Sequence, residues 1–96
     1  MVTEGHIADT RARAGARIRA LRKERGYSQY KFSDMIGMDR TYLIGVEKGR
    51  RNVSIDNLIK IAEGLDVRLS TLFESIDVEM QDRGNSYRRG REGGAQ

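Results

Sequence analysis

The sequence predicts one all-α domain built from five short helices. Apolar residues recur at spacings of three and four, and no segment alternates apolar and polar residues as a strand would. Glycine or a good N-capping residue separates each periodic segment from the next. The chain has 96 residues and no proline, so glycines and caps supply all the helix ends. This length is typical of one small domain.

The first predicted helix begins between Asp9 and Ala16 and ends at Arg25. Gly26 follows as a C-terminal stop. The apolar face of this helix carries Ala14, Ile18 and Leu21. Residues 1–11 lack such a pattern, and we expect them to form a flexible N-terminal tail.

The second and third predicted helices form the most informative segment of the chain. They span about residues 28–36 and 40–48, with Ser28 and Asp39 as N-caps. Gly37 lies at the corner between them, where the backbone is expected to need a positive φ angle. Five apolar residues of this segment can point to one interior: Phe32, Ile36, Met38, Leu43 and Val46. Two short helices joined in this way are typical of a helix-turn-helix.

Two further helices are predicted at about residues 55–64 and 69–75. Ser54 caps the former, whereas Arg68 is a poor cap for the latter. Their apolar residues are Ile55, Leu58, Ile61, Ala62, Leu65, Leu69, Leu72 and Phe73. None of the five helices is long enough to persist alone, so we expect one shared core within residues 12–76. Residues 77–96 are rich in glycine and charge, and we expect a polar, disordered C-terminal tail.

Composition excludes several classes of function. The chain has no cysteine and one histidine, His6, which is expected to be a solvated tail residue. With no paired carboxylates in an apolar setting either, we expect no enzyme, no metal site and no cofactor. No apolar stretch is long enough to span a membrane, and no secretory signal is visible, so a cytoplasmic location is expected.

Basic charge is concentrated in the N-terminal half. Residues 1–53 contain 12 Lys and Arg against 6 Asp and Glu, a net charge of +6. Residues 54–75 contain 2 against 4, a net charge of −2, and residues 76–96 balance at 4 against 4. The basic half is the half that contains the predicted helix-turn-helix. A field of this sign attracts polyanions, which indicates a nucleic-acid partner.

The residues from Ala14 to Glu74 resemble the Cro/C1-type helix-turn-helix domain, also called the XRE family, of phage repressors and restriction-modification controller proteins. The resemblance rests on the order and spacing of several short motifs. These are Ile18-Arg-Ala-Leu-Arg22, Gly26-Tyr-Ser-Gln29, Gly37, Arg40-Thr-Tyr-Leu43, Val46-Glu-Lys-Gly49, Asn52, Leu58-Ile-Lys-Ile-Ala62 and Leu72-Phe-Glu74. It implies a five-helix fold whose third helix enters the major groove of double-stranded DNA.

The resemblance also implies which residues contact DNA. Arg40 and Thr41 would face base edges, with Ile44 and Gly45 at the remaining groove-facing positions. Gln29, Lys48, Arg50 and Asn52 would hold the sugar-phosphate backbone. Tyr42 has two interpretations, a contact with sugar and phosphate or a partly buried spacer against the second helix. The complete expected set is Gln29, Arg40, Thr41, Tyr42, Ile44, Gly45, Lys48, Arg50 and Asn52.

Two structural roles are expected, the former from the same resemblance and the latter from an excess of apolar residues at the C-terminal end over what a small core needs. Arg22 and Glu47 would form an ion pair that fixes the recognition helix. The fifth helix and the end of the fourth would form the face of a homodimer, which a palindromic operator requires. The residues expected there are Leu69, Leu72, Phe73 and Ile76, with Val78 as a further candidate.

We therefore predict a transcriptional regulator that binds a roughly palindromic operator as a homodimer. The first alternative is an antitoxin or adaptor of the same fold that acts through a second protein, such as a toxin or a polymerase subunit. A more distant alternative is a protein-interaction domain that has lost DNA binding. The salt dependence of binding separates the last alternative, since phosphate contacts weaken steeply as salt rises.

Overall fold

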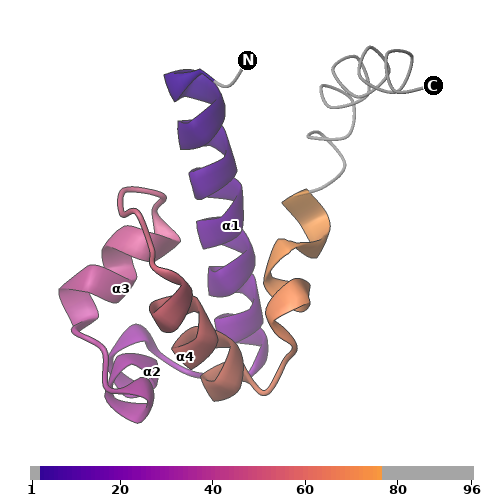
Figure 1. Cartoon of the computed structure of the whole chain (residues 1–96). Helices are drawn as coiled ribbons and strands as arrows, with labels where there is room; N and C mark the ends of the chain where they lie inside the picture. The colour runs from indigo at the N-terminus through magenta and orange to yellow at the C-terminus, as the bar shows by residue number, and fades with distance from the viewer. Residues whose placement is uncertain (1–2, 77–96) are drawn as a thin grey trace.

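The computed structural model describes residues 3–76, which form four α-helices and a closing 3-10 helix. The helices are α1 (Glu4–Glu24), α2 (Gln29–Ile36), α3 (Arg40–Glu47), α4 (Ile55–Leu65) and η1 (Leu69–Ile76). The long α1 runs through the molecule, with α2 and α3 to one side of it and η1 to the other (Figure 1). This architecture confirms the predicted all-α class. The predicted C-terminal tail, including Val78, lies outside the described residues.

The expected start of the first helix is wrong, because α1 begins at Glu4. Most of the residues assigned to a flexible N-terminal tail therefore form about two helical turns. Thr3 caps them, since its Oγ1 accepts a hydrogen bond from the His6 amide at 3.1 Å. Arg13 also pairs with Asp9 at 3.1 Å, one turn away. Capping and local pairs hold these turns without a continuous apolar face, which is why periodicity did not reveal them.

The turn between α2 and α3 has the expected geometry. Gly37 adopts the left-handed conformation, with φ 66° and ψ 39°. The Met38 amide donates to the Ser33 carbonyl at 2.9 Å, which closes the end of α2. At the start of α3, Asp39 Oδ2 accepts a hydrogen bond from the Tyr42 amide at 3.0 Å. The two helices are therefore joined by a turn that the sequence specifies at both of its ends.

One core lies between α1 and the other four helices. Every helix contributes apolar side chains to it, as the stripes in the sequence require. The most deeply buried side chains are Ile18, Phe32, Leu43, Ile61, Leu65 and Leu72. Gly15 is needed where α1 passes the end of α3. A Cβ atom there would collide with the carbonyl oxygens of Val46 and Glu47, so only glycine permits this approach.

The closing helix η1 corrects the expected dimer face. Leu72 is fully buried and Ile76 is 2% exposed within a single chain, so neither is available to a partner. Leu69 and Phe73 are half-buried and pack against the same core. The apolar excess at this end therefore covers the chain's own core to a large extent. Among residues 3–76, no helix is both long and apolar enough to cross a bilayer.

Candidate nucleic-acid interface

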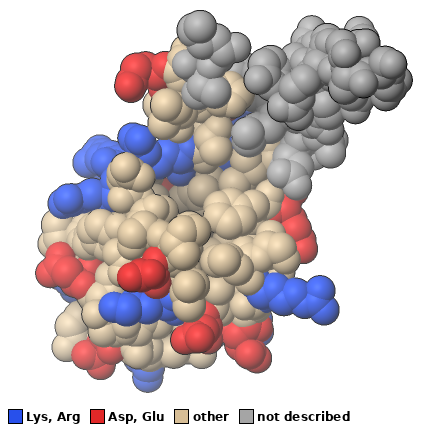
Figure 2. Space-filling model, in the orientation of Figure 1, with Lys and Arg blue, Asp and Glu red and all other residues tan. Residues whose placement is uncertain are grey.

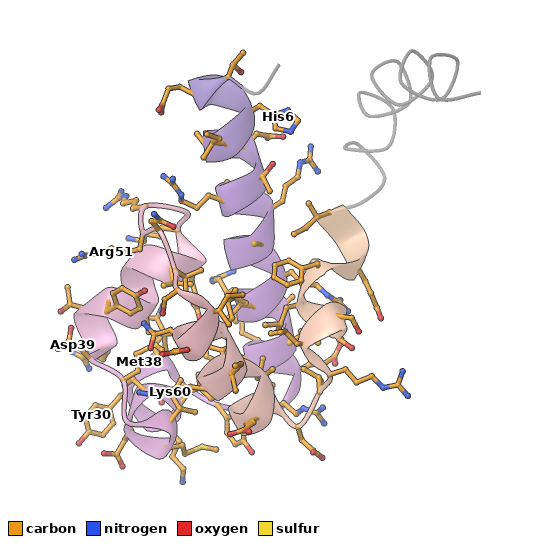
Figure 3. All side chains as sticks on the ribbon, in the orientation of Figure 1. His6, Tyr30, Met38, Asp39, Arg51 and Lys60 are labelled. Atoms are coloured by element: carbon orange, nitrogen blue, oxygen red, sulfur yellow. The ribbon has the colours of Figure 1, made fainter. Side chains whose placement is uncertain are left out.

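The first residues of α3 are free, while its other side is held in the core. Leu43, Val46 and Glu47 are buried, whereas Arg40 and Thr41 are exposed. Asp39 and Tyr30 lie beside this free end, on the same edge of the molecule as Arg51 (Figure 3). The structure thus presents the side chains expected to read bases on a helix that is anchored behind them.

A buried ion pair anchors the C-terminal end of α3. Arg22 Nε lies 2.6 Å from Glu47 Oε2, and Arg22 Nη2 lies 3.0 Å from Glu47 Oε1. The two side chains are only 6% and 1% exposed. Arg22 Nη1 also donates to the Tyr27 carbonyl at 2.6 Å. This bidentate pair joins α1 to α3, and each charge is compensated within the protein.

Gln29 belongs to the same network. Its Nε2 amide donates to Glu47 Oε1 at 3.0 Å, so the first residue of α2 is tied to the last residue of α3. A side-chain amide has two hydrogens, and this bond uses one of them. The other hydrogen is left for the backbone phosphate that the family resemblance implies for Gln29. The N-terminus of α2 adds the positive end of a helix dipole at this place.

Arg40 is oriented by an exposed tyrosine. The guanidinium carbon of Arg40 lies 5.7 Å from the centre of the Tyr30 ring, a cation–π distance. Tyr30 is itself 67% exposed and contributes little to the core. Its ring therefore limits the conformations of Arg40 without removing the guanidinium from solvent. No pattern in the sequence singled out Tyr30 as a partner of Arg40.

Tyr42 and Arg51 form a second cation–π contact on α3. The Arg51 guanidinium carbon lies 5.6 Å from the centre of the Tyr42 ring. The Tyr42 hydroxyl accepts a hydrogen bond from Asn57 of α4 at 3.2 Å. Tyr42 is thus half-buried, as its structural interpretation required, but its hydroxyl is bonded to α4.

The position of Gly45, which the resemblance places toward the groove, is covered in this structure. Gly45 is buried, because the Arg51 side chain lies across it. A Cβ atom on Gly45 would stand 2.7 Å from Arg51 Cγ and 3.2 Å from Arg51 Nε. Arg51 was not among the predicted site residues. Its place in a basic loop next to a glycine-containing helix was the only signal in the sequence.

The loop between α3 and α4 is basic and open. Lys48, Arg50 and Asn52 are exposed, and their side chains make no hydrogen bond or ion pair within the described range 3–76. The Arg50 backbone amide donates to the Gly45 carbonyl at 2.8 Å, which fixes the loop to the end of α3. Figure 2 shows blue basic side chains gathered on the face formed by this loop and α1.

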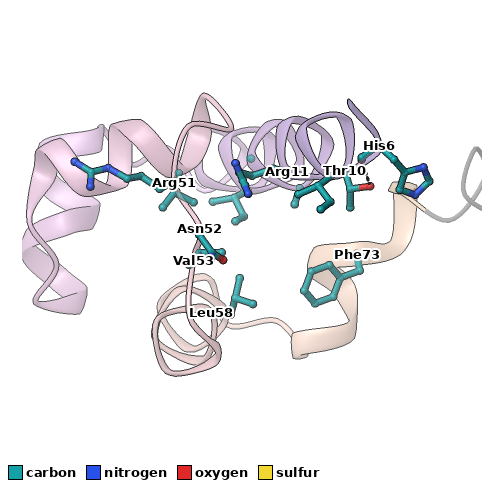
Figure 4. Close-up of a pocket in the computed structure, with 13 residues that line it drawn as sticks. His6, Thr10, Arg11, Arg51, Asn52, Val53, Leu58 and Phe73 are labelled. Atoms are coloured by element: carbon teal, nitrogen blue, oxygen red, sulfur yellow. Dashed lines mark hydrogen bonds between the residues drawn. The ribbon is translucent and has the colours of Figure 1, made fainter. Parts of the chain in front are cut away.

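A pocket of about 410 Å³ lies behind this loop, between α1, the start of α4 and η1. Most of its lining is apolar, with Arg11, Arg51 and Asn52 at one end and His6 at the other (Figure 4). His6 is half-buried on α1, so the expected solvated tail position is wrong. No group of three or more metal-ligating side chains exists among residues 3–76.

Of the predicted contact residues, Arg40, Thr41, Lys48, Arg50 and Asn52 are all exposed on α3 and the loop that follows it. Ile44 is half-buried and Gly45 is covered. Gln29 and Tyr42 are half-buried at the edge of this surface, each with a bonded side chain.

Comparison with known proteins agrees with this geometry. A family model described as helix-turn-helix matches residues 18–72. The chain is 46% identical over 72 residues to the control protein C.MunI from Mycoplasma sp., an alignment that covers 74% of this chain and 97% of C.MunI.

Solved structures give the same result. The restriction-modification controller protein C.AhdI from Aeromonas hydrophila superposes with a TM-score of 0.64 and 44% identity, covering 65% of this chain and 94% of C.AhdI. The controller protein C.Esp1396I, solved as a tetramer on its natural 35 base-pair operator, superposes with a TM-score of 0.63 and 31% identity. That match covers 73% of this chain and 92% of C.Esp1396I.

Proposed function

This chain belongs to the helix-turn-helix family, and we propose that it is a transcriptional regulator that binds operator DNA in a sequence-specific way. One observation carries the proposal. The exposed start of α3 presents Arg40 and Thr41, while the buried pair between Arg22 and Glu47 fixes the opposite end of the helix. A helix held in this way can enter a major groove while keeping its position relative to the rest of the domain.

The contacts divide by chemistry. Arg40 can donate two hydrogen bonds to guanine O6 and N7, and Thr41 can contact a thymine methyl group or hydrogen-bond a base. Lys48, Arg50 and Asn52 of the loop, with Gln29 at the start of α2, would hold phosphates and set the register. This division assigns sequence selectivity to α3 and most of the electrostatic affinity to the loop.

The regulator would act as a homodimer. One recognition helix reads only a few base pairs, and a two-fold dimer places a second helix about 34 Å along the duplex. Of the residues expected at the dimer face, Leu69 and Phe73 keep exposed surface, and α4 adds Ile55 and Ile59, which are 61% and 41% exposed. We also propose that the protein is dimeric on its operator, is located in the cytoplasm and has no enzymatic activity.

Selection of bound duplexes from random DNA tests the proposal. We expect a two-fold symmetric consensus whose half-sites are separated by about one helical turn. Ile59→Glu should lower the dimer fraction measured by analytical ultracentrifugation and weaken binding to the full operator, while a single half-site is bound as before. If selection enriches no sequence, the protein is not a sequence-specific regulator. In that case the alternative of an adaptor acting through a second protein becomes the better account.

A further inference from the structure

The N-terminal half of α1 lies beside the basic loop and outside residues 18–72, the range that the family model matches. The two segments touch at Gly49 and Ala12. A Cβ atom on Gly49 would stand 2.7 Å from the Ala12 Cα atom and 2.9 Å from its amide nitrogen. Arg11, the residue before Ala12, therefore belongs to the same surface as the loop. It lines the end of the pocket where Arg51 and Asn52 also lie (Figure 4).

Arg11 differs from three other arginines of α1, whose side chains are used within the protein. Arg13 pairs with Asp9, Arg17 donates to the Thr71 carbonyl and to Glu74, and Arg22 pairs with Glu47. Arg11 makes no hydrogen bond or ion pair with any residue from 3 to 76. It is also half-buried on α1.

Half-burial beside other cations is unfavourable for a guanidinium group that lacks an anion. Arg11 and Arg51 line the same pocket, and the Arg51 guanidinium extends away from Arg11 toward the Tyr42 ring (Figure 4). Arg50 is exposed in the same loop. Figure 2 shows several basic side chains close to one another on the face where α1 and this loop lie. A phosphate oxygen pair fits such a group, since guanidinium groups bind phosphate through two parallel hydrogen bonds.

We infer that Arg11 and the loop between α3 and α4 form a second phosphate-binding site, which takes a DNA backbone phosphate beside the groove entered by α3. The inference rests on the proposed function, because the phosphate belongs to the same operator duplex. It adds to that function a contact made by the N-terminal half of α1. The site carries no sequence information, and it increases affinity for every duplex by the same factor.

Salt titration of the full chain tests this site. Binding of the wild type, Arg11→Ala, Arg11→Lys and Arg68→Ala to one selected operator duplex is measured by fluorescence anisotropy from 50 to 200 mM salt. Arg68 is a suitable control, since it is an exposed arginine in the connection before η1 and lies outside the basic face. Each lost phosphate contact lowers the slope of log K against log salt by about 0.9.

We expect Arg11→Ala to reduce the slope by about 0.9, so that the rise in salt costs this variant about threefold less affinity than the wild type. Arg11→Lys should keep the slope, and Arg68→Ala should leave it unchanged. Replacing single phosphates by neutral methylphosphonates locates the contact. One flanking position should weaken the wild type and have no effect on Arg11→Ala, and circular dichroism should show equal folding of all four proteins.

The outcomes separate the two proposals. If the wild type shows a steep slope and Arg11→Ala keeps it, the second site is wrong and the regulator proposal stands. If the wild type binds DNA without salt dependence, both proposals fail. If Arg11→Ala changes selectivity between sequences, then Arg11 contacts a base and the assignment to a phosphate is overturned.

Discussion

The recognition helix α3 and the loop that follows it carry similar polar residues but are held in different ways. Glu47 of α3 is fixed by a bidentate pair and by Gln29, and Leu43 and Val46 pack in the core. The side chains of Lys48 and Arg50 have no partner within residues 3–76. Base edges accept hydrogen bonds from few directions, whereas a phosphate accepts them from many. The helix that is proposed to read base edges is therefore held rigidly, whereas the loop that is proposed to attract phosphates carries unpaired charges.

Breaking the anchor of α3 should have the largest effect. Glu47→Ala leaves Arg22 buried without a counter-charge, and we expect a loss of about 3–5 kcal/mol in the free energy of unfolding. Urea denaturation measures this change. The double variant Arg22→Met with Glu47→Leu removes both charges and should recover most of the stability. Equal stability of Glu47→Ala and the wild type would show that the pair does not hold α3.

Separating α1 from α3 should cost less. Gly15→Ala places a methyl group against the carbonyls of Val46 and Glu47, so one helix must shift. Such overpacking typically costs about 1–3 kcal/mol of stability. Thermal unfolding measures this cost. Ala16→Ser alters the exposed neighbour on the same helix and serves as the control, which should stay near the wild type. A stable Gly15→Ala protein would contradict the close approach of the two helices.

Removing the side chain at the tip of α3 should change selectivity. We expect Arg40→Ala to cost on the order of 1–3 kcal/mol of binding and to relax preference at one base pair. Gel-shift competition with operators mutated at each position measures both effects. Tyr30→Leu removes the ring beneath Arg40, and we expect a weaker change at the same base pair. If Arg40→Ala keeps the full preference, another residue reads that base.

Removing a charge from the loop should have the smallest effect on affinity and should leave the preference between DNA sequences unchanged. Lys48→Ala is expected to weaken binding to operator and unrelated duplexes by the same factor, because a phosphate contact carries no sequence information. The slope of log K against log salt should fall by about 0.9. A change in operator preference would instead show that Lys48 contacts a base. It would contradict the assignment of base contacts to α3 and phosphate contacts to the loop.

The sequence predicted the helix-turn-helix well because its signals are local. Capping residues, Gly37 and the apolar spacing all act within a few residues of the position they determine, and α2 and α3 lie where they indicated. The start of α1 escaped prediction for a related reason. Thr3 and the Arg13–Asp9 pair stabilise helical turns that have no apolar face to detect.

The errors at the site depend on contacts between distant residues. Leu72 and Ile76 cover the chain's own core, but an apolar residue that covers a core and one that covers a partner look the same in a sequence. Gly45 is shielded by Arg51 through a loop that no periodicity describes. The role of Gly15 likewise depends on where α3 ends in space. Predicting such features requires knowing how the helices pack against one another. That packing depends on the whole core and not on any single local segment.

Dimethyl sulfate protection of guanine N7 on the selected operator tests most directly whether the free end of α3 enters the major groove. N7 faces that groove, and Arg40 is expected to cover it. We predict two protected guanine clusters about 34 Å apart along the duplex, both lost with Arg40→Ala. Full methylation of every operator guanine in the presence of saturating protein would contradict insertion of α3.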